Sequence, residues 1–294
     1  MLRAHQPSRL EMMLGRIDRR LVYLGLFLVT LIPMVAGFKL PLYPTEPPRM
    51  LAQTIDSLPL DKVVFISSDW DAGTQAESRP QMVGIVRHLI RRNLRFVIFS
   101  IAYPTSPQLG HTAVLDAIRL ENAEDRYVYG TMWANLGYKL ADDPWLRAFT
   151  TDIQQATRQD WKGAPLSQLT VMQGVHKFGP TGQVSMLINV TGSSTIEYWY
   201  QFLGPTKAKF GLGCTAVQAP EQYPYLDSGQ LSGLLTGMKG AAEYELIIGA
   251  PGFGSAAMSG QSFAHLYILI LIVLGNLSLL VGWVQRRQRG REAR

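Results

Sequence analysis

Two long apolar runs lie near the ends of the chain, one at residues 21–38 and one at residues 264–284. The first contains no charged side chain and directly follows a pair of arginines. The second contains only a few polar side chains and is followed two residues later by another pair of arginines. An α-helix needs about 20 apolar residues to cross the hydrocarbon of a bilayer. Each run therefore predicts one transmembrane helix.

Each run has an alternative interpretation. The first could be a cleaved signal peptide, but such apolar regions usually have only about 7–15 residues and end in a small-x-small site. Residues 35–38 match that site poorly, so we expect an uncleaved anchor. The second could be a buried core helix, but Tyr267 and Trp283 lie near its two ends, as aromatic side chains do at membrane interfaces. We expect the polar Asn276 inside this run to face the first helix rather than a second copy of the chain.

Positive charge is concentrated in two short tails. Residues 1–20 carry +3 and residues 285–294 carry +4, which leaves −1 for residues 21–284 because the whole chain carries +6. A nucleic-acid-binding protein would carry this charge on its folded domain, so we expect no nucleic-acid partner. Positive residues beside a membrane span stay in the cytoplasm. The pattern predicts an inner or plasma membrane protein with both termini cytoplasmic and residues 39–263 periplasmic or extracellular.

Between the two runs, short apolar segments alternate with amphipathic ones. The apolar, β-branched segments predict strands at 62–67, 95–102, 127–132, 183–190 and 208–216. The amphipathic segments predict helices at 49–58, 80–92, 110–120, 144–155 and 195–202, and a long final helix at 227–248. This alternation is typical of an α/β domain with a mostly parallel sheet and flanking helices. We expect an extended proline-rich linker at 39–48 and a flexible tether at 249–260.

Ligands bind open parallel sheets beyond the carboxyl ends of the strands, so the residues that follow strands are the candidates for a site. Ser68, Asp69 and Asp71 follow the first strand. Two carboxylates at this spacing bind a divalent cation or act as acid and base in some enzymes. Asp and Ser also cap turns and helices, which is the more common role. A phosphatase-like site would need a second acidic pair, and the only adjacent pair of aspartates, Asp142 and Asp143, precedes a predicted helix.

Two further candidates follow later strands. Ser193 and Ser194 lie in a hydroxyl-rich turn that either binds an anion through backbone N–H groups or simply caps the next helix. Cys214 and Thr215 follow a glycine-containing strand, and the thiol is either a nucleophile or, more commonly, a buried packing group. Residues 211–216 formally match G-x-G-x-x-A, but they do not open the first strand–helix unit as a dinucleotide motif would.

The sequence gives no indication of a metal site, a cofactor or a disulfide. The five histidines show no metal-ligand spacing, so we expect no metal site, and no sequence feature names a cofactor. The single cysteine excludes an intrachain disulfide. Small residues at 233, 237, 240 and 241 in the predicted final helix favour close packing on the sheet, or alternatively contact with a helix of a partner.

Three segments resemble a group of bacterial two-span membrane proteins. They are Gly37–Pro47 (GFKLPLYPTEP), Gly213–Ala216 (GCTA) and Tyr223–Glu245 (YPYLDSGQLSGLLTGMKGAAEYE). The resemblance covers most of the chain and implies the same two-span layout with an extracytoplasmic α/β domain. No activity is attached to that group, so it supplies no catalytic residues.

The sequence favours a membrane-anchored extracytoplasmic module that binds a ligand or a protein partner, or serves as a scaffold. One alternative is a membrane-tethered hydrolase or transferase that uses Asp69 and Asp71. Another is an accessory subunit of a larger membrane complex. The expected partners are the lipid bilayer and either another membrane protein or a second copy of the chain.

Overall fold

The computed structural model describes residues 18–37 and 42–292. Most of the predicted N-terminal basic tail, the start of the predicted linker and the last two residues lie outside the described residues. The chain divides into two compact units. One, Pro41–Ser255, is called the domain below, and the other combines residues 1–40 with residues 256–294.

A six-stranded, all-parallel sheet forms the centre of the domain, in the strand order β3-β2-β1-β4-β5-β6. The strands are β1 Val63–Asp69, β2 Arg95–Ser100, β3 Trp133–Tyr138, β4 Val184–Thr191, β5 Lys209–Cys214 and β6 Leu234–Thr236. The predicted α/β class with a parallel sheet is confirmed. The chain moves outward from β1 to β3 and then returns to place β4 beside β1, so two halves meet at the centre of the sheet.

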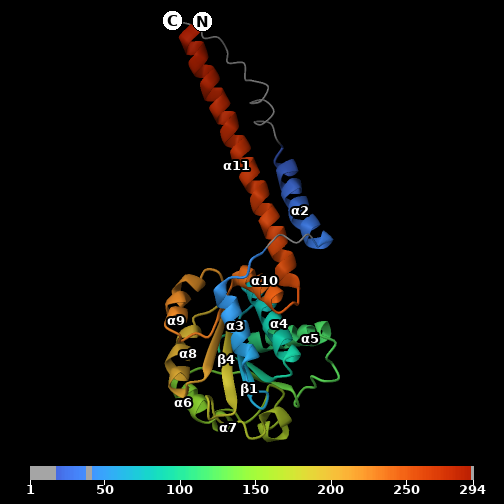
Figure 1. The fold of residues 1–294 in the computed structure, drawn as a ribbon, viewed down its shortest axis with the longest axis vertical. Helices are drawn as coiled ribbons and strands as arrows, with labels where there is room; N and C mark the ends of the chain where they lie inside the picture. The colour runs from blue at the N-terminus through green and yellow to red at the C-terminus, as the bar shows by residue number, and fades with distance from the viewer. Residues whose placement is uncertain (1–17, 38–41, 293–294) are drawn as a thin grey trace. The chain divides into compact units, whose positions relative to one another are not determined.

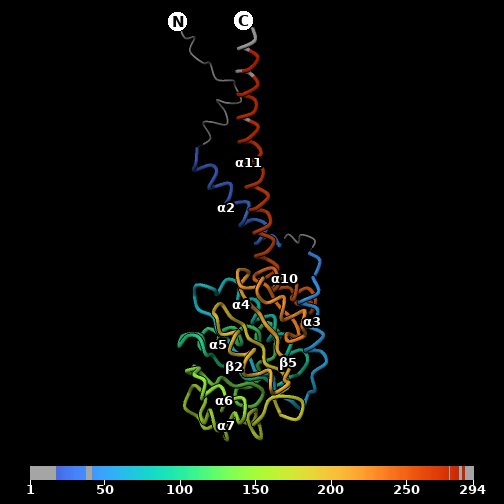
Figure 2. The backbone as a smooth tube through the Cα atoms, turned by 90° about the vertical axis from the view of Figure 1, so that its left-hand side faces the viewer, coloured from blue at the N-terminus to red at the C-terminus, as the bar shows by residue number. Residues whose placement is uncertain are grey.

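Helices cover both faces of this sheet (Figures 1 and 2). One face carries α3 Glu46–Asp56, α4 Gln75–Arg91, α5 Ser106–Leu120 and α10 Gly237–Ile247. The other carries α6 Asp143–Thr151, α7 Ile153–Ala156, α8 Ile196–Leu203 and α9 Tyr223–Asp227, together with short 3₁₀ turns. The helix after β1 and the helix after β4 therefore lie on opposite faces, which in a doubly wound sheet defines the position where ligands usually bind.

The two faces have separate apolar cores because successive strand side chains point to opposite sides. Along β1, Val63 and Phe65 belong to one core, and Val64 and Ile66 belong to the other. Every residue of β1 is buried. A strand that is covered on both faces needs a continuous apolar run, which is why this segment was recognisable from the sequence.

The third strand lies further along the chain than predicted. Residues 127–132 form a turn, in which Gly130 has a φ of +81° and its amide donates to the Trp133 carbonyl at 2.7 Å. The Tyr127 ring is buried, and its hydroxyl donates to the Leu94 carbonyl at 3.0 Å. The strand begins only at Trp133.

The predicted long helix at 227–248 is wrong. Its first residues end α9, Leu234–Thr236 forms β6 at the edge of the sheet, and α10 starts only at Gly237. Gly229 and Gly237 have φ values of +77° and +55°, and such left-handed residues interrupt a helix. Gly233 and Gly237 therefore flank the edge strand instead of lying within a helix, whereas Gly240 does lie in α10 and packs closely on the sheet, where an added Cβ would be 2.8 Å from the carbonyl carbon of Leu235.

Both predicted connecting segments are more ordered than expected. Helix α3 begins at Glu46, inside the predicted linker, because proline is tolerated in the first turn of a helix and Pro47 and Pro48 occupy that turn. The predicted tether at 249–260 is helical from Phe253, where α11 (Phe253–Glu292) begins.

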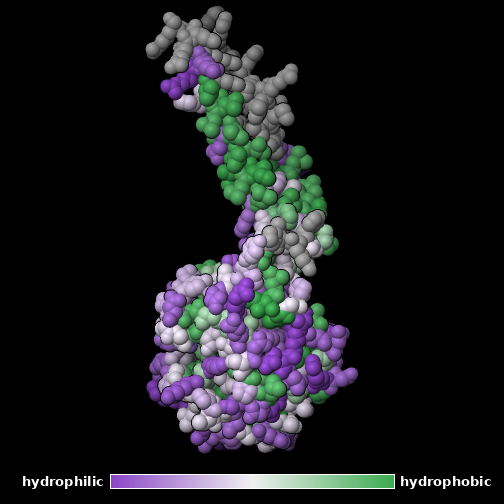
Figure 3. Space-filling view, viewed as in Figure 1, coloured by the Kyte–Doolittle hydropathy of each residue, from purple (hydrophilic) through white to green (hydrophobic). Residues whose placement is uncertain are grey.

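The second unit contains α2 (Arg19–Ala36) and most of α11. Among the described residues, two helices are long and apolar enough to cross a membrane, Arg19–Ala36 and Phe253–Val284. Their exposed surfaces are strongly apolar, whereas the surface of the domain is mixed (Figure 3). The Tyr267 hydroxyl donates to the Val22 carbonyl at 3.2 Å. Asn276 donates to the Ile272 carbonyl of its own helix at 2.9 Å rather than to α2.

Candidate functional site

The residues selected from the sequence gather along one edge of the sheet. Asp69 pairs in register with Thr191, and Thr191 pairs with Cys214, at the carboxyl ends of β1, β4 and β5. Ser68 lies in β1, Ser193 follows β4, and the remaining candidates flank the same strand ends. These residues, which are far apart in the sequence, therefore share the edge at which open α/β sheets bind ligands.

Asp69 is completely buried and its carboxylate is occupied by the protein itself. It accepts hydrogen bonds from Ser67 Oγ at 2.6 Å, Asn189 Nδ2 at 2.7 Å, Ser100 Oγ at 2.9 Å, Ile101 N at 2.7 Å and Ala102 N at 3.2 Å. Burial raises the pKa of Asp69, and the hydrogen bonds from Ser67, Ile101, Ser100 and Ala102 oppose that rise. A carboxylate has about four lone-pair positions, so five donors leave none for a metal or a substrate. Asp69 joins the ends of β1, β2 and β4.

Asp71 shapes the loop between β1 and α4. Its Oδ1 accepts hydrogen bonds from the backbone amides of Gly73 at 3.0 Å and Thr74 at 3.2 Å. In doubly wound folds that bind nucleotides, the amides of this first loop hold the phosphates. Here the Asp71 carboxylate occupies them. Within residues 18–37 and 42–292, no three His, Cys, Asp or Glu side chains are grouped to hold a metal ion.

The loops after β1, β4 and β5 pack directly on one another. A Cβ on Gly192 would lie 2.5 Å from Thr74 Oγ1, so the loop after β4 fits closely against the loop after β1. The Ser193 carbonyl accepts from Gln218 Nε2 at 3.0 Å, and Thr215 Oγ1 donates to Gln218 Oε1 at 3.0 Å. These contacts fill the position where the two halves of the sheet meet.

The sulfur of Cys214 is part of the core. The residue is fully buried, and burial, assisted by the Glu77 charge, raises the pKa of the thiol to about 12. The reactive thiolate is therefore scarce at neutral pH. The Cys214 carbonyl accepts from Gln81 Nε2 at 2.9 Å, which fixes α4 to the end of β5. Ser68 is also buried, and its Oγ packs against Gly110, where an added Cβ would lie 2.7 Å away.

The domain has open space elsewhere, on the helical face formed by α4 and α5. A cavity of about 600 Å³ lies there, and we call it the α4–α5 cavity. It is lined by Ala72, Gln75, Ala76, Arg79, Pro80, Val83, Asp116, Arg119, Leu120, Glu245, Gly252 and Phe253. Small-molecule sites in proteins typically enclose about 300–1,000 Å³ with mostly apolar walls and a few polar groups. The α4–α5 cavity fits that description in both respects.

Four charged side chains line this cavity, and three of them form one group. Asp116 makes ion pairs with both Arg79 and Arg119, the second at 3.2 Å. The fourth, Glu245, is almost fully buried and accepts hydrogen bonds from the amides of Gly252 and Gly254, each at 2.9 Å. The Glu245 carboxylate is thus satisfied by the backbone, and the two guanidinium groups share a single carboxylate.

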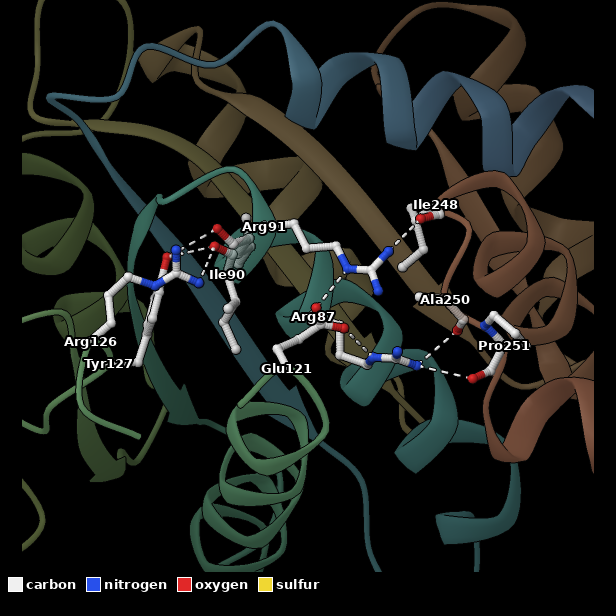
Figure 4. Close-up of polar contacts among 10 residues, drawn as sticks. Arg87, Ile90, Arg91, Glu121, Arg126, Tyr127, Ile248, Ala250 and Pro251 are labelled. Carbon is white, nitrogen blue, oxygen red and sulfur yellow. Dashed lines mark hydrogen bonds and ion pairs between the residues drawn. The ribbon is translucent and has the colours of Figure 1, made fainter. Parts of the chain in front are cut away.

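Two arginines of α4 hold the segment 248–251, which leads directly into the cavity wall (Figure 4). Arg87 and Arg91 each donate to Glu121 at 2.7 Å, one to each carboxylate oxygen. Arg87 also donates to the Ala250 carbonyl at 2.8 Å, and Arg91 to the Ile248 carbonyl at 2.7 Å. Although burial raises the pKa of Glu121, the hydrogen bonds from Arg91 and Arg87 bring it below its ordinary value. This cluster fixes the segment between α10 and α11.

Sequence reasoning did not find the α4–α5 cavity. The predicted helix began at Pro80, so Ala76 and Arg79 were not recognised as part of a helical face. Phe253 lies in the segment predicted to be a flexible tether, and the prediction of a helix at 110–120 gave Asp116 no role. The sequence contains one signal for this site: Phe253 lies between two glycines shortly before a long apolar run, and an isolated aromatic side chain at such a position usually packs against another segment. No family model, curated protein or solved structure matches the chain.

Proposed function

We propose that the chain is a membrane-anchored binding module. In this proposal α2 and α11 cross an inner or plasma membrane, the domain lies on the non-cytoplasmic side, and a small ligand occupies the α4–α5 cavity. The observation that carries the proposal is the cavity itself, about 600 Å³ with apolar walls and two arginines at one side.

The helical pair supports the membrane part of the proposal. Val22 contacts Tyr267, and the Thr30 carbonyl lies 3.0 Å from the position of a Cβ on Gly260, so α2 and α11 run in opposite directions. Two antiparallel spans return the chain to the side on which it began. The arginines beside both spans favour the cytoplasm for that side.

A cysteine-accessibility experiment tests the orientation. Cys214 is replaced by Ala, and a single cysteine is introduced either at Val217, which is 87% exposed in the domain, or at Gln288, near the C-terminal end of α11. With the envelope opened to small molecules but the membrane intact, a membrane-impermeant maleimide should label Val217→Cys. It should label Gln288→Cys only after lysis. The reverse pattern would overturn the orientation.

Binding is favoured over catalysis because the carboxylates of Asp69 and Asp71 already accept hydrogen bonds from the protein itself. A tethered hydrolase or transferase would use Asp69 and Asp71 as free carboxylates, yet Asp69 has five donors and Asp71 closes its own loop. A role as an accessory subunit remains compatible with the helical pair, since most of the apolar surface of α2 and α11 is exposed.

Native mass spectrometry of the full chain in lipid nanodiscs tests ligand binding. Ala76→Trp adds an indole to the cavity lining at an exposed position on α4, and Val217→Trp adds the same group at an exposed position outside the lining. We expect a retained small molecule on the wild type and on Val217→Trp, and none on Ala76→Trp. The same spectra for all three proteins would overturn binding in this cavity.

A further inference from the structure

We propose that the ligand of the α4–α5 cavity is a single-chain lipid with an anionic headgroup. This inference rests on the proposed function, because it assigns the chemical class of ligand to the same site. Two separate features of the cavity carry it, the character of its walls and the unused donors of its arginines.

The walls suit an acyl chain. Small and apolar side chains cover the α4 side, at Ala72, Ala76, Pro80 and Val83. Two large apolar side chains complete the walls, and each remains 55% exposed, Leu120 at the end of α5 and Phe253 at the start of α11. Covering such surface contributes about 25 cal/mol per Å² of apolar area removed from water, and an acyl chain supplies that cover without any polar group to desolvate.

The headgroup assignment comes from Arg79 and Arg119. A guanidinium has five N–H donors. The hydrogen bonds found for the described residues use one donor of each arginine, and both go to Asp116. Arg119 has a side chain that is 67% exposed, so its remaining donors face solvent. Guanidinium groups bind carboxylate and phosphate in a two-point geometry, so a lipid of either headgroup type fits here.

The anionic headgroup would meet little opposing charge. Glu245 also lines the cavity, but its carboxylate accepts from Gly252, Gly254 and Ser255 and is almost fully buried. It compensates the positive end of α11, where the backbone amides have no partners within the helix. Asp116 is the remaining acidic group, and it is outnumbered by the two arginines.

A lipid explains both features at once. A small soluble anion would use the arginines but leave the apolar walls bare, and a neutral hydrocarbon would leave the donors unused. In the proposed function the membrane would supply the lipid, because Phe253 lies on α11 only eleven residues before Ala264, where the apolar run begins. Lipid binding strength grows with the apolar area buried and with the electrostatic attraction of the headgroup.

Photolabelling of the full chain in phosphatidylcholine nanodiscs tests the proposal. The probe is palmitate carrying a diazirine on its chain, and labelled peptides are mapped by mass spectrometry. We expect labels in peptides containing residues 72–83, 116–120 or 253, reduced about tenfold in Ala76→Trp and unchanged in Val217→Trp. Labels confined to the apolar helices, or equal labelling of the two variants, would overturn the lipid assignment.

A second comparison isolates the headgroup. Arg119→Glu should reduce labelling of the cavity peptides by palmitate several-fold, while labelling by the uncharged diazirine analogue of hexadecanol stays the same. Arg158→Glu changes the net charge equally at an exposed position on the other side of the sheet and should affect neither probe. An equal loss with both probes would overturn recognition of an anionic headgroup.

The two proposals fail in different ways. If native mass spectrometry shows a bound molecule that Ala76→Trp removes, but palmitate does not label the cavity, the binding module stands and the lipid assignment falls. If Ala76→Trp changes neither measurement, both proposals fall.

Discussion

The Glu245 carboxylate accepts hydrogen bonds from the backbone amide of Ser255 at 2.8 Å and from its hydroxyl at 2.6 Å. Because Gly252 and Gly254 donate to the same carboxylate, one buried side chain of α10 satisfies the first turn of α11. The first amides of a helix have no partners within the helix and carry a partial positive charge, which a carboxylate neutralises. The domain thus fixes the start of the helix that continues into the second apolar run.

The first prediction concerns this cap. In Glu245→Gln, an NH₂ group would face backbone amides that need an acceptor, and losing hydrogen bonds to a buried charged group should cost about 2–4 kcal/mol locally. Hydrogen exchange of the amides at 252–255 should become at least about tenfold faster. Glu197→Gln, at an exposed position in the first turn of α8, serves as the matched control. Unchanged exchange at these amides would show that the cap does not hold the start of α11.

The second prediction separates Asp69, the last residue of β1, from Asp71, which lies two residues later in the following loop. Asp69→Ala leaves five donors without an acceptor in the interior and should lower the free energy of unfolding by about 3–5 kcal/mol. Asp71→Ala removes a loop cap and should cost about 1 kcal/mol. Thermal unfolding of the two variants in the same detergent measures the difference. A small effect of Asp69→Ala would contradict the structural role assigned to that carboxylate.

The elements that could be predicted from the sequence are those in which one feature decides the structure. The strands β1, β2, β4 and β5 are continuous apolar runs because helices cover both of their faces, and each was predicted to within two residues at either end. Ligands bind open parallel sheets beyond the carboxyl ends of the strands, and this rule selected Asp69, Ser193 and Cys214 without any knowledge of the strand order. In the structure these residues lie at one edge of the sheet.

The parts that could not be predicted depend on contacts between distant segments. Strand β6 has only three residues, and it forms because Leu234 pairs with Leu212 rather than because of its own pattern. The hydrogen bonds that Asp69 accepts from Ser100 of β2 and Asn189 of β4 cannot be predicted from any single segment either. The α4–α5 cavity needs residues from α4, α5, α10 and the start of α11 at once, and none of these segments carries a motif by itself.

The third prediction concerns pH. His88 is buried between Tyr244 Oη at 2.7 Å and Asp56 Oδ1 at 3.2 Å, and burial lowers its pKa, although the Asp56 charge opposes this change. Below about pH 6.5, the unfolded chain binds a proton on this histidine before the folded protein does. Stability contributed by the neutral ring is therefore complete above that pH and decreases as the pH falls towards the folded-state pKa.

The decrease for one such group is at most about 1.4 kcal/mol per pH unit. His111 contributes in the same direction, because burial and the Lys162 charge lower its pKa too. Denaturant unfolding at several pH values between 7 and 5 should show a smaller slope for His88→Gln than for the wild type. Identical slopes would mean that His88 is protonated equally in both states.

The last prediction tests how α3 is held against the edge of the sheet. A Cβ on Gly233 would lie 2.3 Å from the backbone nitrogen of Leu51 and 2.4 Å from its Cα. Since both are backbone atoms of α3, the helix itself would have to move. Gly233→Ala should therefore lower the free energy of unfolding by about 3–5 kcal/mol, at the upper end of what single substitutions cost.

Gly163→Ala is the matched control for this substitution. Both glycines have a φ that L-residues rarely adopt, +154° at Gly233 and +84° at Gly163, but no atom lies within 4 Å of a Cβ added to Gly163. Gly163→Ala should cost only about 1–2 kcal/mol, the price of a left-handed backbone for an L-residue. Because the two variants differ in the clash with α3, the difference in their unfolding midpoints measures that contact. Equal midpoints would show that α3 yields freely, and then its attachment to the β5–β6 edge would contribute little to the stability of the domain.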